Sequence, residues 1–214
     1  MSRLVDDLRT LANAESGTLT LRKEPTDLAA LIQEVVRSFA GDAQSKQISI
    51  RSNLPPDLPI ITIDPLRIRE VLVNIISNAV RQAPEAGNIA VAAGVENERM
   101  VVSVTDSGPG ISPQDLAKIF DRFYKGATSR GSGLGLTIAR SLINGHGGEI
   151  RAENIPGNGA MLTFFDPEQF RMTSRYPGAP NNDAGVKSHR LRVRWTISPP
   201  SRPLVSVARR AGQF

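Results

Sequence analysis

Apolar residues recur three and four positions apart in several stretches of the chain, which is the spacing of one face of an α-helix. This pattern predicts helices over residues 1–14, 28–39, 65–81 and 137–144, and a further helix that begins at Ser112. Thr26 or Asp27 is expected to cap the second helix, and Asp64 the third. The stripe of the third helix that we expect to face a core consists of Leu66, Val71, Leu72, Ile75, Ile76 and Ala79.

Between these helices, apolar and polar residues alternate as they do in half-buried strands. The alternation predicts strands over residues 18–22, 48–50, 60–63, 89–95, 100–105, 149–153 and 160–165. The fourth and fifth strands are expected to form one hairpin, and the last two a second hairpin around the turn PGNG. Helices mixed with antiparallel strands predict an α+β fold, a two-layer α/β sandwich with helices on one face of the sheet.

The pattern ends after Pro167, where the composition also changes. The chain of 214 residues has 26 basic and 21 acidic side chains; nine basic and two acidic ones lie in residues 168–214, which leaves 17 and 19 in residues 1–167. The net charge of +5 therefore comes from the tail, and we expect no nucleic-acid partner. Five prolines in this tail favour a disordered extension. Apolar and basic residues alternate around Trp195, so a basic β-strand is the alternative.

Composition narrows the class further. The absence of cysteine excludes a disulfide scaffold, Cys-ligated zinc and thiol chemistry. No run approaches the ~18 apolar residues of a membrane span, and the start MSRLVDDLR is unlike a secretory signal. We therefore expect a cytoplasmic protein with no membrane span of its own.

Two amides interrupt the apolar sequence VLVNIISNAV in the helix over residues 65–81. Asn74 and Asn78 are four residues apart, so they share one face and are offset by about 6 Å along the axis. Asn is a poor helix former, and a solvated face is one explanation for the pair. The alternative is a pair of oxygens directed at a ligand, because Mg²⁺ takes oxygen ligands and is commonly shared with phosphates.

Two glycine-rich segments follow. Asp106-Ser107-Gly108-Pro109-Gly110 leaves a strand of alternating valines; it is either an ordinary turn or a site where a carboxylate accepts from the amino group of adenine. The segment GSGLGL, residues 131–136, precedes a helix, and glycines at a helix N-terminus expose amides that suit phosphate. No strand of a βαβ unit precedes it, so a Rossmann fold is disfavoured.

In this order, VLVNIISNAVR, DSGPGIS, KIFDRFYKG, GSGLGLTIA and GHGGEIRAENIPGNGAMLTFF resemble the N, G1, F, G2 and G3 boxes of the histidine-kinase ATP-binding domain. The resemblance covers about residues 15–166. It implies the Bergerat fold, a mixed sheet of about five strands with three main helices on one face and a mobile lid over ATP. The implied cofactors are ATP and Mg²⁺.

The resemblance also implies roles for individual residues. Asn78 would ligate Mg²⁺, Asn74 would support that site, and Arg81 and Lys125 would act on the phosphates in catalysis. Asp106 would hold adenine. Further ATP contacts are implied for Gly108, Gly110, Ile111, Phe120, Phe123, Arg130, Gly133, Leu134, Gly135 and Leu136. A solvated helix end for Arg81, a core role for the two phenylalanines and a loop role for the lid cations stay open.

Asn74 distinguishes two reactions within this superfamily. In members that hydrolyse ATP with water, as gyrase does, the residue four positions before the Mg²⁺-binding Asn is a Glu that acts as general base. An amide cannot take a proton, so the resemblance favours phosphoryl transfer to an acceptor side chain. A gyrase-type ATPase is the less favoured alternative.

The acceptor of such a transfer is expected outside this chain. Residues 1–16 resemble the end of the dimerisation-domain helix, residues 17–167 the ATP-binding domain, and residues 168–214 form the basic tail. Neither His146, in the turn GHGG, nor His189, in the tail, has the helical setting and adjacent acid of an acceptor. We therefore expect transfer to a His on a separate dimerisation-domain protein, for relay to a response regulator. A non-catalytic ATP-binding module from a truncated gene is the alternative.

Overall fold

The computed structural model describes residues 3–96, 99–126, 132–156 and 159–165. Its helices are α1 (Arg3–Glu15), α2 (Leu28–Ser38), α3 (Ala40–Ser45), α4 (Pro65–Gln82), α5 (Pro113–Leu116) and α6 (Gly135–His146). Its strands are β1 (Glu24–Thr26), β2 (Ser49–Asn53), β3 (Ile61–Ile63), β4 (Asn88–Glu96), β5 (Arg99–Asp106), β6 (Glu149–Asn154) and β7 (Ala160–Phe165). The predicted tail, residues 168–214, lies outside the described residues.

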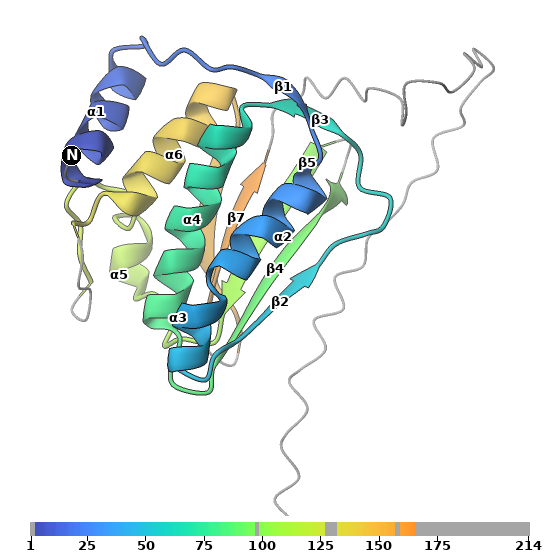
Figure 1. The fold of residues 1–214 in the computed structure, drawn as a ribbon. Helices are drawn as coiled ribbons and strands as arrows, with labels where there is room; N and C mark the ends of the chain where they lie inside the picture. The colour runs from blue at the N-terminus through green and yellow to red at the C-terminus, as the bar shows by residue number, and fades with distance from the viewer. Residues whose placement is uncertain (1–2, 97–98, 127–131, 157–158, 166–214) are drawn as a thin grey trace, which may run out of the picture.

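The main sheet has five strands in the order β2-β4-β5-β7-β6. Strand β2 runs parallel to β4, and the other neighbours are antiparallel, so the sheet is mixed. Helices α2, α4 and α6 cover one face of this sheet, and α1 packs along the outer side of α6 (Figure 1). The predicted α+β two-layer sandwich and both hairpins are confirmed.

The core lies between the sheet and the three covering helices. Burial is complete there because each helix presents one apolar stripe to the sheet. Fully buried side chains include Leu28, Ile32, Leu72, Ile75, Ile138 and Leu142 from the helices and Ile89 and Leu162 from the strands.

Two sequence predictions about this layer are wrong. Residues 18–22 form no strand; the backbone N–H of Arg22 donates to Asp64 Oδ2 at 2.9 Å, and the short strand is β1, which pairs with β3. Leu66 is 72% exposed, because it lies about half a helical turn away from the buried stripe that begins at Ile68.

The helix expected from Ser112 is the single turn α5, which the Ser112 hydroxyl caps by accepting from the Asp115 N–H at 3.2 Å.

The N-terminus of α4 is fixed by a buried carboxylate. Asp64 is 5% exposed, and its Oδ1 accepts from the N–H groups of Leu66 and Arg67, both at 3.1 Å. Its Oδ2 accepts from Arg22, as above. The predicted cap is therefore confirmed, and it also anchors the chain that leads from α1 to β1. At α2 the cap is Asp27 rather than Thr26, because Asp27 Oδ1 accepts from the Ala30 N–H at 2.9 Å.

His146 joins the end of α6 to this same point. The backbone N–H of Asp64 donates to His146 Nε2 at 3.2 Å, so the proton of the neutral ring lies on Nδ1, which donates to the Leu142 carbonyl at 2.8 Å. Burial lowers the pKa of His146, with the positive charge of Lys23 acting in the same direction. We call this arrangement of Asp64 and His146 the α4–α6 junction.

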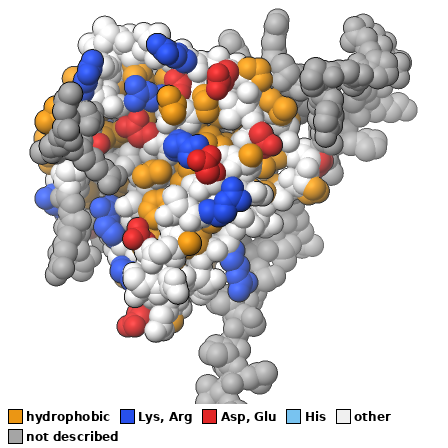
Figure 2. Space-filling view, in the orientation of Figure 1, with side chains coloured by type: hydrophobic (Ala, Val, Ile, Leu, Met, Phe, Trp, Pro, Cys, Tyr) orange, Lys and Arg blue, Asp and Glu red, His pale blue; other side chains and the backbone are white. Residues whose placement is uncertain are grey.

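The outer surface of the helical layer carries charges of both signs among apolar and uncharged side chains. Figure 2 shows basic and acidic side chains interspersed over this face. One pair, Arg69 of α4 and Glu34 of α2, forms two hydrogen bonds of 2.7 and 2.8 Å between the helices. Within the part of the chain that the structure describes, no helix has the length and apolar character required to cross a membrane.

The α4–α6 junction gives a stability prediction. Asp64→Ala removes the acceptor of three backbone N–H groups at a buried site, so we expect the free energy of unfolding to fall by about 2–3 kcal/mol. Asp27→Ala, which removes a single cap, should lower it by only ~1 kcal/mol. Urea titration followed by circular dichroism measures both. An equal loss in the two variants would contradict the anchoring role of Asp64.

Candidate functional site

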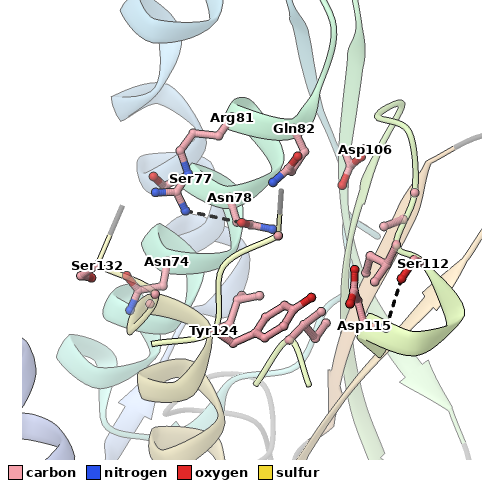
Figure 3. Close-up of a pocket in the computed structure, with 18 of the residues that line it drawn as sticks. Asn74, Ser77, Asn78, Arg81, Gln82, Asp106, Ser112, Asp115, Tyr124 and Ser132 are labelled. Carbon is pink, nitrogen blue, oxygen red and sulfur yellow. Dashed lines mark hydrogen bonds between the residues drawn. The ribbon is translucent and has the colours of Figure 1, made fainter. Parts of the chain in front are cut away.

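A cavity of about 450 Å³ opens where α4, α6, α5 and the end of β5 meet (Figure 3). Its wall combines residues that are far apart in the sequence. The lining residues are Asp7, Asn74, Ser77, Asn78, Arg81, Gln82, Asp106, Gly110, Ile111, Ser112, Asp115, Ile119, Tyr124, Gly126, Ser132, Gly133, Gly135, Leu136 and Ala160. Nine of the residues predicted from the sequence are among them: Asn74, Asn78, Arg81, Asp106, Gly110, Ile111, Gly133, Gly135 and Leu136.

The polar face of α4 forms one wall. Asn74, Asn78 and Arg81 point from it into the cavity (Figure 3). Asn78 Oδ1 accepts from Arg81 Nη2 at 3.4 Å, so the amide and the guanidinium lie side by side. Asn74 reaches the neighbouring helix, because a Cβ placed on Gly135 of α6 would lie only 3.3 Å from Asn74 Oδ1.

Asp106 lies at the opposite end of the cavity, at the last position of β5. It is 4% exposed, and Oδ1 accepts from the Gly108 N–H at 2.8 Å. Burial raises the pKa of the Asp106 carboxyl, and hydrogen bonds from the backbone of Gly108 and Ala160 oppose that shift. Gly108 does not line the cavity, but a Cβ there would lie 2.7 Å from Asp106 Oδ1, so the turn requires glycine.

The loop after Asp106 is held by a residue that sequence reasoning missed. Asn154 Oδ1 accepts from the Ile111 N–H at 2.7 Å, and Asn154 Nδ2 donates to the Ile111 carbonyl at 2.6 Å. Gly110, beside it, has φ +78°, in the left-handed region. The side chain of Asn154 thus fixes the backbone that lines this end of the cavity.

The glycine-rich segment forms the third wall, at the start of α6. Gly133 has φ +74°, and a Cβ there would lie 2.7 Å from the backbone carbon of Phe123. Leu134 is fully buried in the core and does not line the cavity. Among the described residues, no side chain caps the N-terminus of α6. Its first amides and the positive end of its dipole therefore suit an anion.

The predicted lid residues that the structure describes, Phe120, Phe123 and Lys125, do not line this cavity. Phe120 is buried in the core, with Arg140 Cζ 5.7 Å from its ring centre, which agrees with a packing role. Phe123 is 61% exposed with φ +59°. Neither phenylalanine nor Lys125 lines the cavity, and Arg130 lies outside the described residues. Their contact with ATP stays a prediction.

Tyr124 and Asp115 form a pair that the sequence did not reveal. Both line the cavity, and the electrostatic interaction between the Tyr124 hydroxyl and the Asp115 carboxylate shifts the pKa of each group. The interaction lowers the pKa of Asp115 and raises that of Tyr124. Asp7, Gln82 and Ser132 were missed as well, because their approach to the cavity depends on how α1, α4 and α6 pack.

The donor groups in the cavity fit Mg²⁺ bound together with phosphates. Asn74 and Asn78 supply neutral amide oxygens, which are hard ligands. Within the described residues, no three His, Cys, Asp or Glu side chains form a cluster that could hold a metal ion. A divalent cation here would therefore take most of its ligands from the phosphates and water, with Asn78 as the predicted protein ligand.

The fold and the cavity together define an ATP-binding domain. The chain belongs to the family of histidine kinase-, DNA gyrase B- and HSP90-like ATPases, whose model matches residues 63–169. It is 37% identical over 174 residues to the sensor histidine kinase WalK of Bacillus subtilis, which covers 78% of this chain and 28% of WalK. The chain is also 31% identical over 172 residues to BaeS of Escherichia coli, a signal transduction histidine-protein kinase. This match covers 78% of this chain and 37% of BaeS.

Solved structures agree with this assignment. Full-length ShkA in complex with AMPPNP matches with a TM-score of 0.70 and 33% identity, over 77% of this chain and 35% of ShkA. The catalytic domain of the histidine kinase ThkA matches with a TM-score of 0.64 and 32% identity, over 69% of this chain and 96% of that domain. The chain spans less than half the length of WalK and BaeS.

The burial of Asp106 gives a prediction on pH. Its pKa in the folded protein is raised above the ordinary value of 3.8, so the folded state binds this proton more tightly than the unfolded chain. The contribution of Asp106 to stability therefore falls as the pH rises from about 3.8 through the folded pKa. Asp106→Asn removes this decrease, so its free energy of unfolding should increase relative to wild type between pH 4 and pH 7.

Urea titrations at several pH values measure this difference. Asp42→Asn, which removes an exposed acid that does not line the cavity, is the matched control. A difference between Asp106→Asn and wild type that stays constant with pH would show that burial does not perturb the carboxyl.

Proposed function

We propose that this chain binds Mg²⁺–ATP and transfers the γ-phosphate to a histidine on a separate polypeptide, for relay to a response regulator. The observation that carries the proposal is the arrangement of one cavity, with a buried carboxylate at one end and amides, a guanidinium and an uncapped helix N-terminus at the other. These two ends match the two chemically different ends of ATP.

The two ends of the cavity support one orientation of bound ATP. The Asp106 carboxylate only accepts hydrogen bonds when ionised, so it selects the exocyclic amino group of adenine. The triphosphate then extends towards Asn78, Arg81 and the N-terminus of α6, where cationic and N–H donors meet negative charge. The complex of ShkA with the ATP analogue AMPPNP supports nucleotide binding by this fold.

The residues near the phosphates favour transfer over hydrolysis. Bound Mg²⁺ supplies charge neutralisation at the phosphate oxygens. Asn74 lies against Gly135 at this end and carries an amide, which cannot remove a proton from water. Asn74 would position the oxygen of Asn78 and the start of α6, and Arg81 would stabilise charge on the transferred group. Lys125, Phe123 and Arg130 would close over the nucleotide as lid residues.

His146 cannot serve as the acceptor of the phosphate. It is 5% exposed, and both ring nitrogens are engaged in the α4–α6 junction. A nucleophilic imidazole needs an accessible ring nitrogen, so the burial of His146 supports an acceptor histidine other than this one. The relatives are sensor histidine kinases, and ThkA has been solved with the response regulator TrrA, which supports a phosphorelay as the context.

Transfer of labelled phosphate tests the proposal. The chain is mixed with γ-labelled ATP, Mg²⁺ and a histidine-containing dimerisation domain from a related sensor kinase or from a neighbouring reading frame. We expect label on the histidine of the partner, stable in base and lost in acid. ATP binding without label on any partner would contradict the kinase proposal. Steady phosphate release without an acceptor would instead indicate a water-using ATPase.

Two single substitutions separate adenine recognition from metal binding. Asp106→Ala should weaken ATP binding about tenfold to over a hundredfold with or without Mg²⁺, because it removes a charged acceptor worth about 1.5–3 kcal/mol. Asn78→Ala should weaken binding in Mg²⁺ but much less in EDTA. Calorimetric titration measures both. An unchanged dissociation constant for Asp106→Ala would contradict the adenine assignment.

A further inference from the structure

The hairpin of β6 and β7 holds the loop that follows Asp106 at two points. At the far end of the loop, Asn154 Oδ1 accepts from the Ile111 N–H at 2.7 Å, and Asn154 Nδ2 donates to the Ile111 carbonyl at 2.6 Å. At the near end, Gly159 has φ +107°, and a Cβ on it would collide with the Asp106 carbonyl oxygen. The same hairpin therefore fixes both ends of one loop.

Asn154 acts on the cavity wall from outside it. Gly110 and Ile111 line the cavity, whereas Asn154 is an exposed residue that does not. A Cβ on Gly110 would lie 3.0 Å from Asn154 Oδ1, so this side chain packs directly on the loop backbone. Ala160, which pairs with Asn154 in the sheet, lines the cavity as well. One side chain thus orients a backbone segment of the wall.

The position of this loop relative to Asp106 decides which edge of a purine the carboxylate meets. An ionised carboxylate only accepts hydrogen bonds, so it pairs with the amino group that adenine carries at C6. Guanine has a carbonyl oxygen at that position, which a carboxylate repels. Its donors are the neighbouring ring N–H and the amino group at C2, so guanine would have to lie displaced along the wall to use them.

We propose that Asn154 is a positioning residue, which makes the cavity selective for adenine over guanine by holding Ile111 in one place. The inference rests on the proposed function, in which Asp106 holds adenine. Two short hydrogen bonds to the same residue fix both the position and the orientation of the Ile111 backbone. The wall is therefore set before the nucleotide binds, and it does not shift to admit a displaced base.

The exposure of Asn154 separates this role from the stability of the fold. In Asn154→Ala, water replaces both bonds to Ile111, because these bonds lie at the surface and leave no buried polar group without a partner. We therefore expect the variant to fold. The loss falls on the order of the loop, which the bound nucleotide then has to supply.

The test measures base selectivity together with the protection of one amide. ATP, adenosine and GTP are titrated calorimetrically into the full chain and into Asn154→Ala, Asn154→Asp and Asn53→Ala. Asn53 is the matched control, because it is also an exposed asparagine at the end of an edge strand, β2, and does not line the cavity. Amide hydrogen exchange of Ile111 is followed by NMR without nucleotide.

We expect Asn154→Ala to bind ATP and adenosine about tenfold more weakly than wild type, by the same factor, because the phosphate contacts are untouched. Binding of GTP should be measurable and no weaker than in wild type, so the preference for ATP over GTP falls about tenfold. Asn154→Asp keeps the acceptor for the Ile111 N–H but loses the donor, so its preference should be intermediate. The Ile111 amide should exchange faster in Asn154→Ala, and Asn53→Ala should match wild type.

Four results would overturn the inference. An equal loss of affinity for ATP and GTP in Asn154→Ala, or no measurable binding of GTP, would show that the side chain does not set base selectivity. An unchanged affinity for ATP would show that the loop needs no support. Unchanged exchange of the Ile111 amide would show that Asn154 does not hold it. If wild type binds neither ATP nor adenosine, the proposed function itself fails, which is seen before any variant is compared.

Discussion

The geometry of the ATP cavity depends on the α4–α6 junction at the opposite end of the two helices. Asp64 fixes where α4 begins, and its own N–H donates to the last residue of α6, His146. Because an α-helix has a fixed rise and a fixed number of residues per turn, fixing its start also fixes Asn74, Asn78 and Arg81, which lie about two and a half to four and a half turns later. Two walls of one site are thus set by a buried contact that touches no ligand.

The α4–α6 junction requires a neutral imidazole at His146. The N–H of Asp64 needs an acceptor, and His146 Nε2 can accept only while it carries no proton. Burial keeps it in that state by lowering its pKa. For Asp106 the directions are reversed, since burial raises the pKa of its carboxyl and hydrogen bonds from backbone N–H groups oppose the shift. For both His146 and Asp106, burial and a backbone hydrogen bond thus shift the pKa in opposite directions.

Local patterns predicted the fold and about half of the residues that line the cavity, because caps, periodic stripes and glycine-rich turns are signals within a few residues. Three features could be recognised from a few neighbouring residues each: the cap at Asp64, the amide pair on α4 and the glycines before α6. Asn154 gave no such signal, since its two bonds to Ile111 join positions 43 apart. Leu66 was misjudged because an apolar residue in the first turn can be two positions out of the buried stripe. The failures are cases where packing, rather than sequence spacing, decides contact.

The packing of α4 against α6 also explains why Gly135 and Asn74 occur together at one end of the cavity. Gly135 opens α6 and lies so close to Asn74 that a Cβ would be 3.3 Å from its side-chain oxygen. The close approach brings amide oxygens of α4 and the first N–H groups of α6 to one place. A larger residue at 135 would separate them, and an acid at 74 would set a negative charge against the phosphates. An amide keeps an oxygen ligand for a cation without that repulsion, so the pairing of residues 74 and 135 is consistent with the phosphate site that we propose.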